Sequence, residues 1–297
     1  MPFGLPLPPT RSLALVALTF LIACGDGDSD GVAPPTTGSL TVAVTTTGEP
    51  LDADGYSIDV AGTVRIVTGT SVQETYADLP IGSTSVELGD LQENCTVDGA
   101  NPLNVSVPGG DNATASFEVT CVVPAVTVDG VRGPLEWHGA SEEALYDGST
   151  LIHRTDGTLL FLGFELEDAT LGDDDGLTVR FDNAANGTLD AGEHSINANL
   201  SRYLDGHFNG TFWGRVDTDA HGEGAVANTG NGTNFFEFSF PLDSGDPLDF
   251  SLAPGSALGY CVIYVKDGTA TSATMFPAGC NRAGDDLTRY ATLIVGG

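Results

Sequence analysis

The chain has 297 residues, with 41 Asp and Glu against 10 Lys and Arg, which gives a formal net charge of −31. So few basic residues exclude a nucleic-acid binder held by phosphate contacts, and they exclude attraction to anionic lipid headgroups. Hydrophobic residues make up 41% of the chain, which is enough to bury cores, and the length corresponds to about two domains. The 39 Gly residues, with many Thr, Val and Asn, favour strands and turns over helices.

The N-terminal residues 1–23 have the features of an export signal. An apolar run follows Arg11 and is too short to span a bilayer comfortably. It ends in Leu-Ile-Ala-Cys at 21–24, which resembles the lipobox of bacterial lipoproteins, in which the cysteine is lipidated and becomes the first residue. We therefore expect lipidation of Cys24 and a lipid-anchored protein of the bacterial cell envelope, periplasmic or on the cell surface. An ordinary cleaved signal with an incidental cysteine is the alternative.

Residues 24–38 are rich in Gly, Asp, Thr and Pro and have no apolar periodicity. This composition predicts a flexible acidic tether, because such a segment cannot bury enough apolar surface to fold. The tether would hold the folded part away from the membrane, so that membrane contact occurs through the lipid anchor only.

The five cysteines are an odd number, which lipidation of Cys24 explains. The other four then form two pairs in an exported protein. We predict the disulfides Cys95–Cys121 and Cys261–Cys280, each within one domain. Loops of this length stabilise a domain by about 3 kcal/mol in the chain-entropy treatment. Free buried thiols are the alternative.

Residues 39–123 contain short alternating runs separated by turn clusters of Gly, Pro and Asp, which predicts a β-sandwich. A Leu-Pro-Ile-Gly turn at 79–82 precedes a Ser-Val-Glu-Leu strand at 85–88, and Asn-Cys-Thr-Val at 94–97 is followed by a late Phe-Glu-Val-Thr-Cys strand at 117–121. The segment thereby resembles immunoglobulin-like or transthyretin-like spacer modules of bacterial surface lipoproteins, in which the last two segments pair with each other. The resemblance implies a stalk; an adhesive or peptide-binding face is the alternative.

Residues 125–297 carry four motifs in order: Val-Asp-Gly at 128–130 followed by Trp137, and the strands 158–168, 175–183 and 235–242. In this order they resemble carbohydrate-binding module family 9 and its DOMON-like relatives. The resemblance implies an antiparallel β-sandwich that binds carbohydrate, with Trp137 in the core. The strand pattern agrees, because alternation in 235–242 places three Phe side chains on one face. The sequence thus predicts an all-β protein with two antiparallel β-sandwich domains in tandem after a signal peptide and flexible tether.

Residues 182–193 match the twelve-residue EF-hand loop at positions 1, 5, 6, 9 and 12. Ala184 at position 3 offers no oxygen, and a strand rather than a helix enters the loop, so the sequence predicts an EF-like structural calcium site within a sandwich. Asp168 and the acids at 173–175 are candidates for the missing ligand. A polar hairpin with Asn-Gly turn chemistry is the alternative. The predicted calcium ligands are Asp182, Asn186, Thr188, Asp190 and Glu193.

Sugar binding requires an aromatic platform with polar groups at its edges. Trp213 is the candidate platform, because Gly and polar residues flank it. If its segment forms an ordinary hairpin, Trp213 is simply packed over the sheet edge. The residues expected to line the same face are Tyr203, His207, Asn209 and Arg215.

Motifs of catalysis are missing from the sequence, which has no Gly-x-Ser-x-Gly, no His-Glu-x-x-His and no P-loop. The five His residues are scattered, as surface or packing histidines usually are. We therefore expect a non-catalytic protein that binds carbohydrate or a related extracellular ligand. The alternatives are a structural or adhesion envelope protein that binds a protein partner, and a secreted polysaccharide-active enzyme with unfamiliar catalytic carboxylates.

Overall fold

The computed structural model describes residues 33–268, 273–280 and 286–296. The predicted signal peptide and Cys24 lie outside the described residues. Within them the structure consists of β-strands and one short 3₁₀ helix, η2 (Leu287–Arg289), so the all-β class is confirmed. In this part of the chain we find no helix of the length and apolarity that a membrane crossing requires.

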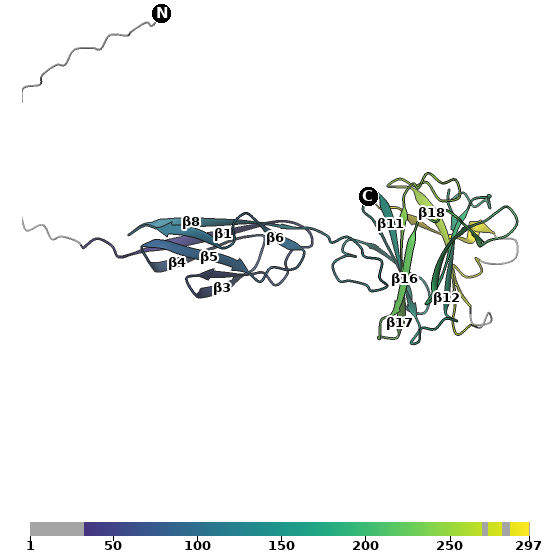
Figure 1. Cartoon of the computed structure of the whole chain (residues 1–297), viewed down its shortest axis with the longest axis horizontal. Helices are drawn as coiled ribbons and strands as arrows, with labels where there is room; N and C mark the ends of the chain where they lie inside the picture. Colours follow the sequence, from purple (N-terminus) through teal and green to yellow (C-terminus); the bar gives the residue numbers. More distant parts are fainter. Residues whose placement is uncertain (1–32, 269–272, 281–285, 297) are drawn as a thin grey trace, which may run out of the picture.

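The first eight strands form two four-stranded sheets, ordered β4-β1-β8-β6 and β3-β2-β5-β7. Both sheets contribute to one apolar cluster, so they are the two layers of a sandwich (Figure 1). The pair β1–β8 is parallel, in contrast to the expected antiparallel arrangement. The strands are β1 (Thr37–Gly48), β2 (Tyr56–Val60), β3 (Thr63–Val67), β4 (Ser71–Pro80), β5 (Gly82–Gly89), β6 (Cys95–Asp98), β7 (Leu103–Val107) and β8 (Asn112–Cys121).

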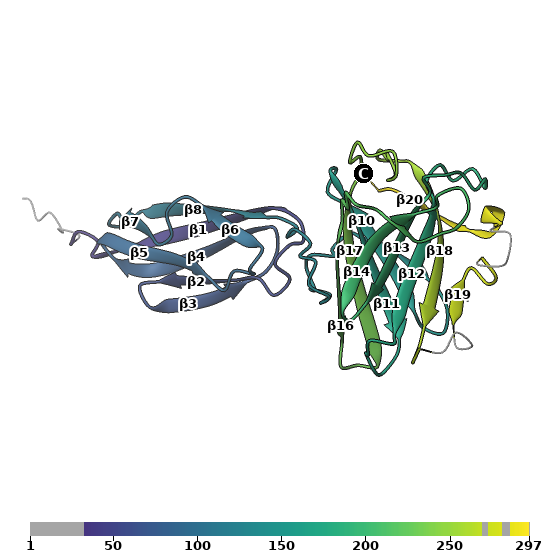
Figure 2. The same cartoon turned by 45° about the vertical axis from the view of Figure 1, so that its right-hand side comes forward.

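The remaining strands form a second sandwich. One sheet has the order β16-β17-β11-β10-β9, and the other has the order β15-β14-β13-β12-β18-β19, with β20 also paired to β18 (Figure 2). The strands are β9 (Ser141–Ala144), β10 (Thr150–Thr155), β11 (Leu159–Glu167), β12 (Gly176–Asp182), β13 (His194–Asn199), β14 (Arg202–His207), β15 (Arg215–Val216), β16 (Glu223–Asn228), β17 (Thr233–Pro241), β18 (Ala257–Val265), β19 (Thr274–Phe276) and β20 (Ala291–Ile294).

Strand β17 is buried on both faces. Phe236, Phe238 and Phe240 lie in the core between the two sheets, as their alternation predicts. On the other face, Phe235 packs edge-on against the Trp137 ring, with the ring centroids 6.1 Å apart. Trp137 is only 6% exposed, which confirms that it is a core residue.

Glu237, on this second face of β17, binds the segment around Asp129 that precedes β9. One carboxylate oxygen, Glu237 Oε2, accepts hydrogen bonds from the backbone N–H groups of Asp129 and Gly130, each at 3.0 Å. The Asp-Gly pair and the glutamate, which were predicted as separate motifs, therefore contact each other across 107 residues of chain. Burial is the main cause that raises the pKa of Glu237 to about 7.

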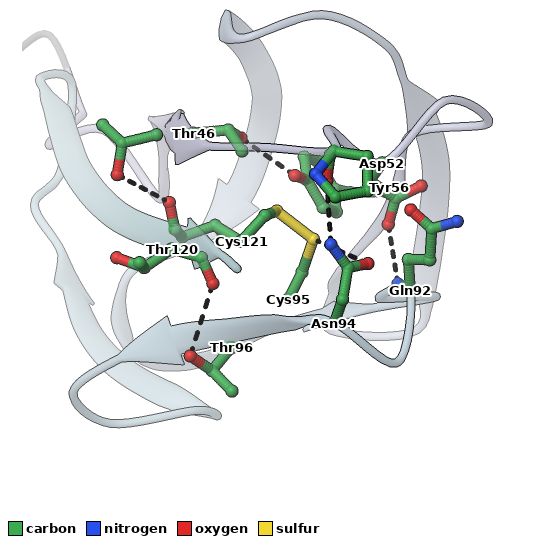
Figure 3. The surroundings of a disulfide bond; sticks show 12 residues. Thr46, Asp52, Tyr56, Gln92, Asn94, Cys95, Thr96, Thr120 and Cys121 are labelled. Carbon is green, nitrogen blue, oxygen red and sulfur yellow. Dashed lines mark hydrogen bonds between the residues drawn. A yellow bond between two sulfur atoms is a disulfide. The ribbon is translucent and has the colours of Figure 1, made fainter. Parts of the chain in front are cut away.

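Both predicted disulfides are present. Cys95 and Cys121 are directly opposite each other on the neighbouring strands β6 and β8 (Figure 3), and Cys261 is bonded to Cys280. Next to the first disulfide, Asn94 Nδ2 donates to the carbonyl oxygen of Pro50 at 2.8 Å. The Asp52 carboxylate accepts the N–H of Gln92 at 2.7 Å, so the loops at this end of the first sandwich are connected by buried polar groups (Figure 3).

Candidate functional site

Trp213 lies in the connection between β14 and β15, and its ring covers part of the outer face of the larger sheet of the second sandwich. The guanidinium carbon of Arg180, on β12, is 5.1 Å from the centre of the Trp213 ring, which is a cation–π arrangement. The Phe208 ring supports Trp213 from the chain just before it, at a centroid distance of 5.4 Å. The indole is therefore held in place by neighbours while part of its surface stays accessible.

A hollow of about 180 Å³ lies beside the Trp213 ring. Its floor consists of outward-facing side chains of the central strands, because alternate residues of a strand point to the same face. Thr178 Oγ1 donates to Asn197 Oδ1 at 2.8 Å across the floor. The lining residues are Thr178, Arg180, Ser195, Asn197, Trp213, Gly214 and Ile263.

Two polar atoms at this hollow have no hydrogen-bond partner among the described residues. They are the indole Nε1 of Trp213 and the hydroxyl Oγ of Ser195, and both are buried. A buried donor or acceptor without a partner costs free energy, so these two atoms mark unpaired polar groups under the rim of the hollow. The hollow places an aromatic ring beside hydroxyl, amide and guanidinium groups. This combination suits a ligand with apolar faces and hydroxylated edges.

The structure does not bring the five predicted ligand-binding residues to one face. Tyr203 and His207 are paired in register with Ala198 and His194, so their side chains point between the two sheets, away from the Trp213 side. The Tyr203 ring packs against Phe238 at a centroid distance of 5.9 Å. The expectation that Tyr203 and His207 line a common surface with Trp213 is therefore corrected.

Asn209 and Arg215 are both exposed and lie on either side of Trp213 in the chain. Asn209 Oδ1 accepts the N–H groups of Thr211 and Phe212, each at 3.0 Å, so it fixes the turn that leads to the indole. Arg215 is paired in register with His207 at the start of the two-residue strand β15. Asn209 thus positions the candidate platform through the backbone.

Sequence reasoning missed the polar floor of the hollow. Thr178, Ser195 and Asn197 are ordinary polar residues on strands, and alternation alone predicts only that they face away from the core. Their role depends on Trp213 folding back over them, and no local pattern in the sequence encodes that contact.

The predicted calcium loop begins at the end of β12 and ends at the start of β13. Asp182 accepts the N–H groups of Asn186 and Gly187, at 3.1 and 2.7 Å, so its two oxygens hold the sharp turn. Gly187 has a φ of 74°, a left-handed conformation that glycine adopts readily. Asn186 Oδ1 in turn accepts the N–H of Thr188 at 2.6 Å. The loop therefore has a defined turn around the predicted ligands.

The Glu193 carboxylate at the end of this loop is only 4% exposed. Burial, together with the negative charges of Asp182 and Asp190, raises its pKa to about 7. A cation between these groups would relieve that repulsion, and all the predicted ligands are oxygens, which calcium prefers.

The upstream acids cannot supply the ligand missing at Ala184. Asp168 is bound to Tyr264 and Lys266, at 2.9 and 3.1 Å, and Asp175 accepts the N–H of Asp267 at 2.7 Å. These acids precede β12, whereas the loop follows it, and a strand of this length separates its ends by roughly 20 Å. The expectation that Asp168 or residues 173–175 complete the loop is therefore wrong.

Comparisons with known proteins gave distant structural likenesses. No family model matches the sequence, and no curated protein matches it. A carbohydrate-binding module of family 9 from Caldicellulosiruptor kristjanssonii, solved with cellotriose, is 10% identical with a TM-score of 0.42, over 59% of this chain and 91% of that one. The same kind of module solved with glucose is 12% identical with a TM-score of 0.40, over 59% and 93%. The major pilin SpaD from Corynebacterium diphtheriae is 11% identical with a TM-score of 0.26, over 80% and 64%.

Proposed function

We propose that this protein is a non-catalytic, lipid-anchored protein of the bacterial cell envelope that binds carbohydrate through the outer face of its second sandwich. The observation that carries the proposal is the Trp213 ring, held by Arg180 beside a floor of hydroxyl and amide groups. Sugar rings have apolar C–H faces that stack on an indole, and their hydroxyls require hydrogen-bond partners at the edge.

Each residue of the hollow has a separate role in this proposal. Trp213 stacks on the sugar ring with the accessible part of its indole. Asn197, which is half-buried, binds a sugar hydroxyl, and Arg180 holds the indole at its fixed angle. Asn209 keeps the turn in shape, while Arg215 lies at the exposed rim.

We also propose that the loop 182–193 holds a structural calcium ion. Asp182, Asn186, Asp190 and Glu193 would bind it with side-chain oxygens, and Thr188 with its carbonyl oxygen. The buried Glu193 carboxylate, with its raised pKa, supports this assignment. When bound, the ion supplies positive charge to a loop that otherwise crowds carboxylates.

A glycan array with the chain from residue 25 onward tests the binding proposal. We expect binding to at least one glycan, a loss in Trp213→Ala, and full retention in Trp137→Phe, because Trp137 lies in the core. Asn197→Ala, at a half-buried site in the hollow, should weaken binding without affecting folding. An array without hits together with a co-purifying protein would support the adhesion alternative, and turnover of a polysaccharide would support the enzyme alternative.

Two further measurements test the ion and the anchor. Addition of a chelator should lower the thermal unfolding midpoint of the wild type but not that of Glu193→Gln, and an unchanged wild-type midpoint would contradict the calcium proposal. Metabolic labelling with a fatty-acid analogue should mark the wild-type chain in a bacterial host. Equal labelling of Cys24→Ser would contradict lipidation at Cys24.

A further inference from the structure

The interior of the second sandwich contains a cluster of His and Asp side chains that the proposed sugar and calcium sites do not use. It lies at the edge of the sheet where β13 begins and β14 ends, next to the end of the proposed calcium loop. His194 opposes His207 in register, and Ile196 opposes Asp205, so His194 and Asp205 point to the same inner face. Asp249 reaches the cluster from the connection between β17 and β18.

These side chains are shielded from water. The side chains of His194 and Asp205 are each 1% exposed, and that of Asp249 is 8% exposed. The imidazole of His194 is surrounded by the rings of Phe181, Phe240 and Phe250, with centroid distances of 5.0 to 5.5 Å. Two buried carboxylates in such apolar surroundings require a compensating positive charge.

The inner atoms of the cluster, which are the imidazole nitrogen Nδ1 and one oxygen of each carboxylate, converge without forming hydrogen bonds to one another. His194 Nδ1 lies 3.4 Å from Asp205 Oδ1 and 3.4 Å from Asp249 Oδ1. Both ring nitrogens of His194 and both of these carboxylate oxygens are buried without a hydrogen-bond partner in the described structure. A single Nδ1–H cannot point at two carboxylates, and a charge-assisted N–H···O bond is shorter, about 2.7–2.9 Å. A simple His–Asp ion pair therefore does not explain the arrangement.

The spacings fit ligands that share a tetrahedral metal ion. With metal–ligand bonds of about 2.0–2.1 Å, tetrahedral geometry separates neighbouring ligand atoms by about 3.3–3.4 Å. The ligand atoms of His194, Asp205 and Asp249 all lie within 4.8 Å of one another, and this is the one such group of three within residues 33–268, 273–280 and 286–296.

His221 lies beside this group, on the outer side of Asp249. Its Nδ1 is 3.1 Å from Asp249 Oδ2, and its side chain is 36% exposed. Its backbone N–H donates to Asp205 Oδ2 at 3.1 Å, while Ser244 Oγ donates to Asp249 Oδ2 at 2.7 Å. These contacts engage the outer oxygens and leave Oδ1 of each carboxylate directed at His194, as outer-shell hydrogen bonds do in metal sites. His221 and Ser244, which contact Asp249, also line a surface hollow.

We propose that His194 Nδ1, Asp205 Oδ1 and Asp249 Oδ1 bind one zinc-class divalent transition-metal ion, with a water molecule as fourth ligand and His221 as an outer-shell partner of Asp249. Imidazole nitrogen favours Zn²⁺ and its neighbours over Ca²⁺ and Mg²⁺, which prefer oxygen ligands only. The ion would tie the connection that carries Asp249 and the segment that carries His221 to the sheet. The site is independent of the proposed sugar site, which uses the opposite face of β13.

Zinc titration of the metal-stripped chain from residue 25 onward tests the proposal. The protein is prepared without a polyhistidine tag, and the buffer contains millimolar Ca²⁺, so that a defect in the calcium loop cannot imitate a defect in the zinc site. We expect one Zn²⁺ per chain by elemental analysis. Co²⁺ in place of Zn²⁺ should give the visible absorption of a four-coordinate ion.

The variants separate this site from adventitious binding. Asp249→Asn, which keeps the shape of the side chain, should weaken zinc binding at least about 100-fold, and His221→Ala about tenfold. His138→Ala is the matched control, because His138 is a similarly exposed histidine, with 42% of its side chain accessible. Far-ultraviolet circular dichroism confirms that each variant is folded. The proposal is overturned if the wild type retains no zinc, if both site variants bind as tightly as the control, or if the millimolar Ca²⁺ displaces the zinc.

Discussion

The two sandwiches bury very different side chains. Among the described residues, the first sandwich buries one Asp, Glu or His side chain, Asp52, whereas the second buries ten. Burying such a group has a large desolvation cost, so a fold that is selected only for stability contains few of them. The ten are His153, Asp168, Asp175, Asp182, Glu193, His194, Asp205, His207, Asp217 and Glu237.

The partners of these groups show what the difference means. Asp52 accepts backbone N–H groups from Gly55 and Gln92, so it serves a loop of its own sandwich. Asp168 in the second sandwich has the ammonium of Lys266 as counter-charge. Glu193 and the carboxylates beside His194 instead lie close to other acids. The buried carboxylate of the first sandwich thus serves its own loop, whereas the second sandwich also buries acids that lie close to one another.

The largest expected effect tests whether the two sandwiches are separate in stability. Phe238→Ala removes a fully buried ring from the second core and should lower its unfolding free energy by about 3–5 kcal/mol. Both Trp residues of the chain, at 137 and 213, belong to the second sandwich, so tryptophan fluorescence in urea reports on it selectively. Phe117→Ala, at an equally buried site in the first core, should leave that transition unchanged. A shift of the fluorescence transition in Phe117→Ala would show that the two unfold together.

The next effect concerns pH. Glu237 ionises at about pH 7 in the folded chain, against an ordinary pKa of 4.5. Because the folded state holds this proton more tightly, the contribution of Glu237 to stability is fully present below pH 4.5 and is lost as the pH rises through 7. Glu237→Gln does not ionise, so relative to the variant the wild type should lose about 3 kcal/mol across this range. Urea unfolding at several pH values, followed by tryptophan fluorescence, measures the difference.

The matched variant for pH in the first sandwich is Asp52→Asn. Burial raises the pKa of Asp52 as well, so the sign of its pH effect should be the same and its size smaller. If the unfolding free energies of wild type and Glu237→Gln changed in parallel with pH, Glu237 would not be a source of the pH dependence.

The smallest effect concerns the polar end of the first sandwich. Asn94→Ala removes the donor to the Pro50 carbonyl and should cost about 1–2 kcal/mol in that sandwich. Circular dichroism follows the transition, and Asn104→Ala, at an exposed site on β7, is the control. Phe117→Ala removes a buried ring from the same sandwich. If Asn94→Ala lowered the unfolding free energy as much as Phe117→Ala does, the hydrogen bond would not be the main contribution of Asn94.

Much of the fold was predictable because strands carry a local signal. Phe236, Phe238 and Phe240 of β17 face the core between the sheets, as their alternation indicates, and each cysteine pair lies within its own sandwich. The second buried face of β17 was not predictable. Glu237 and Phe235 look like solvent-facing residues until the segment containing Asp129 and Trp137 folds over them.

The candidate sites follow the same division. A twelve-residue loop can be recognised in the sequence because its ligands are neighbours in the chain. The cluster at His194 cannot, because Asp249 is 55 residues away and His221 appears in the sequence as an isolated histidine. Likewise, Trp213 could be selected for its polar neighbours. That Tyr203 and His207 do not share its face became clear only from the register of β13 and β14.

The sequence by itself determined the all-β class and the disulfide pairs, and it predicted the export signal and the calcium loop. Each depends on residue spacing within one strand, one loop or one domain. Only the tertiary structure decided which polar residues meet, because side-chain direction changes with every residue of a strand and contacts across a sandwich join distant segments. The two faces of β13 illustrate this: Ser195 and Asn197 face the Trp213 hollow, while the adjacent His194 points inward to a buried cluster of acids.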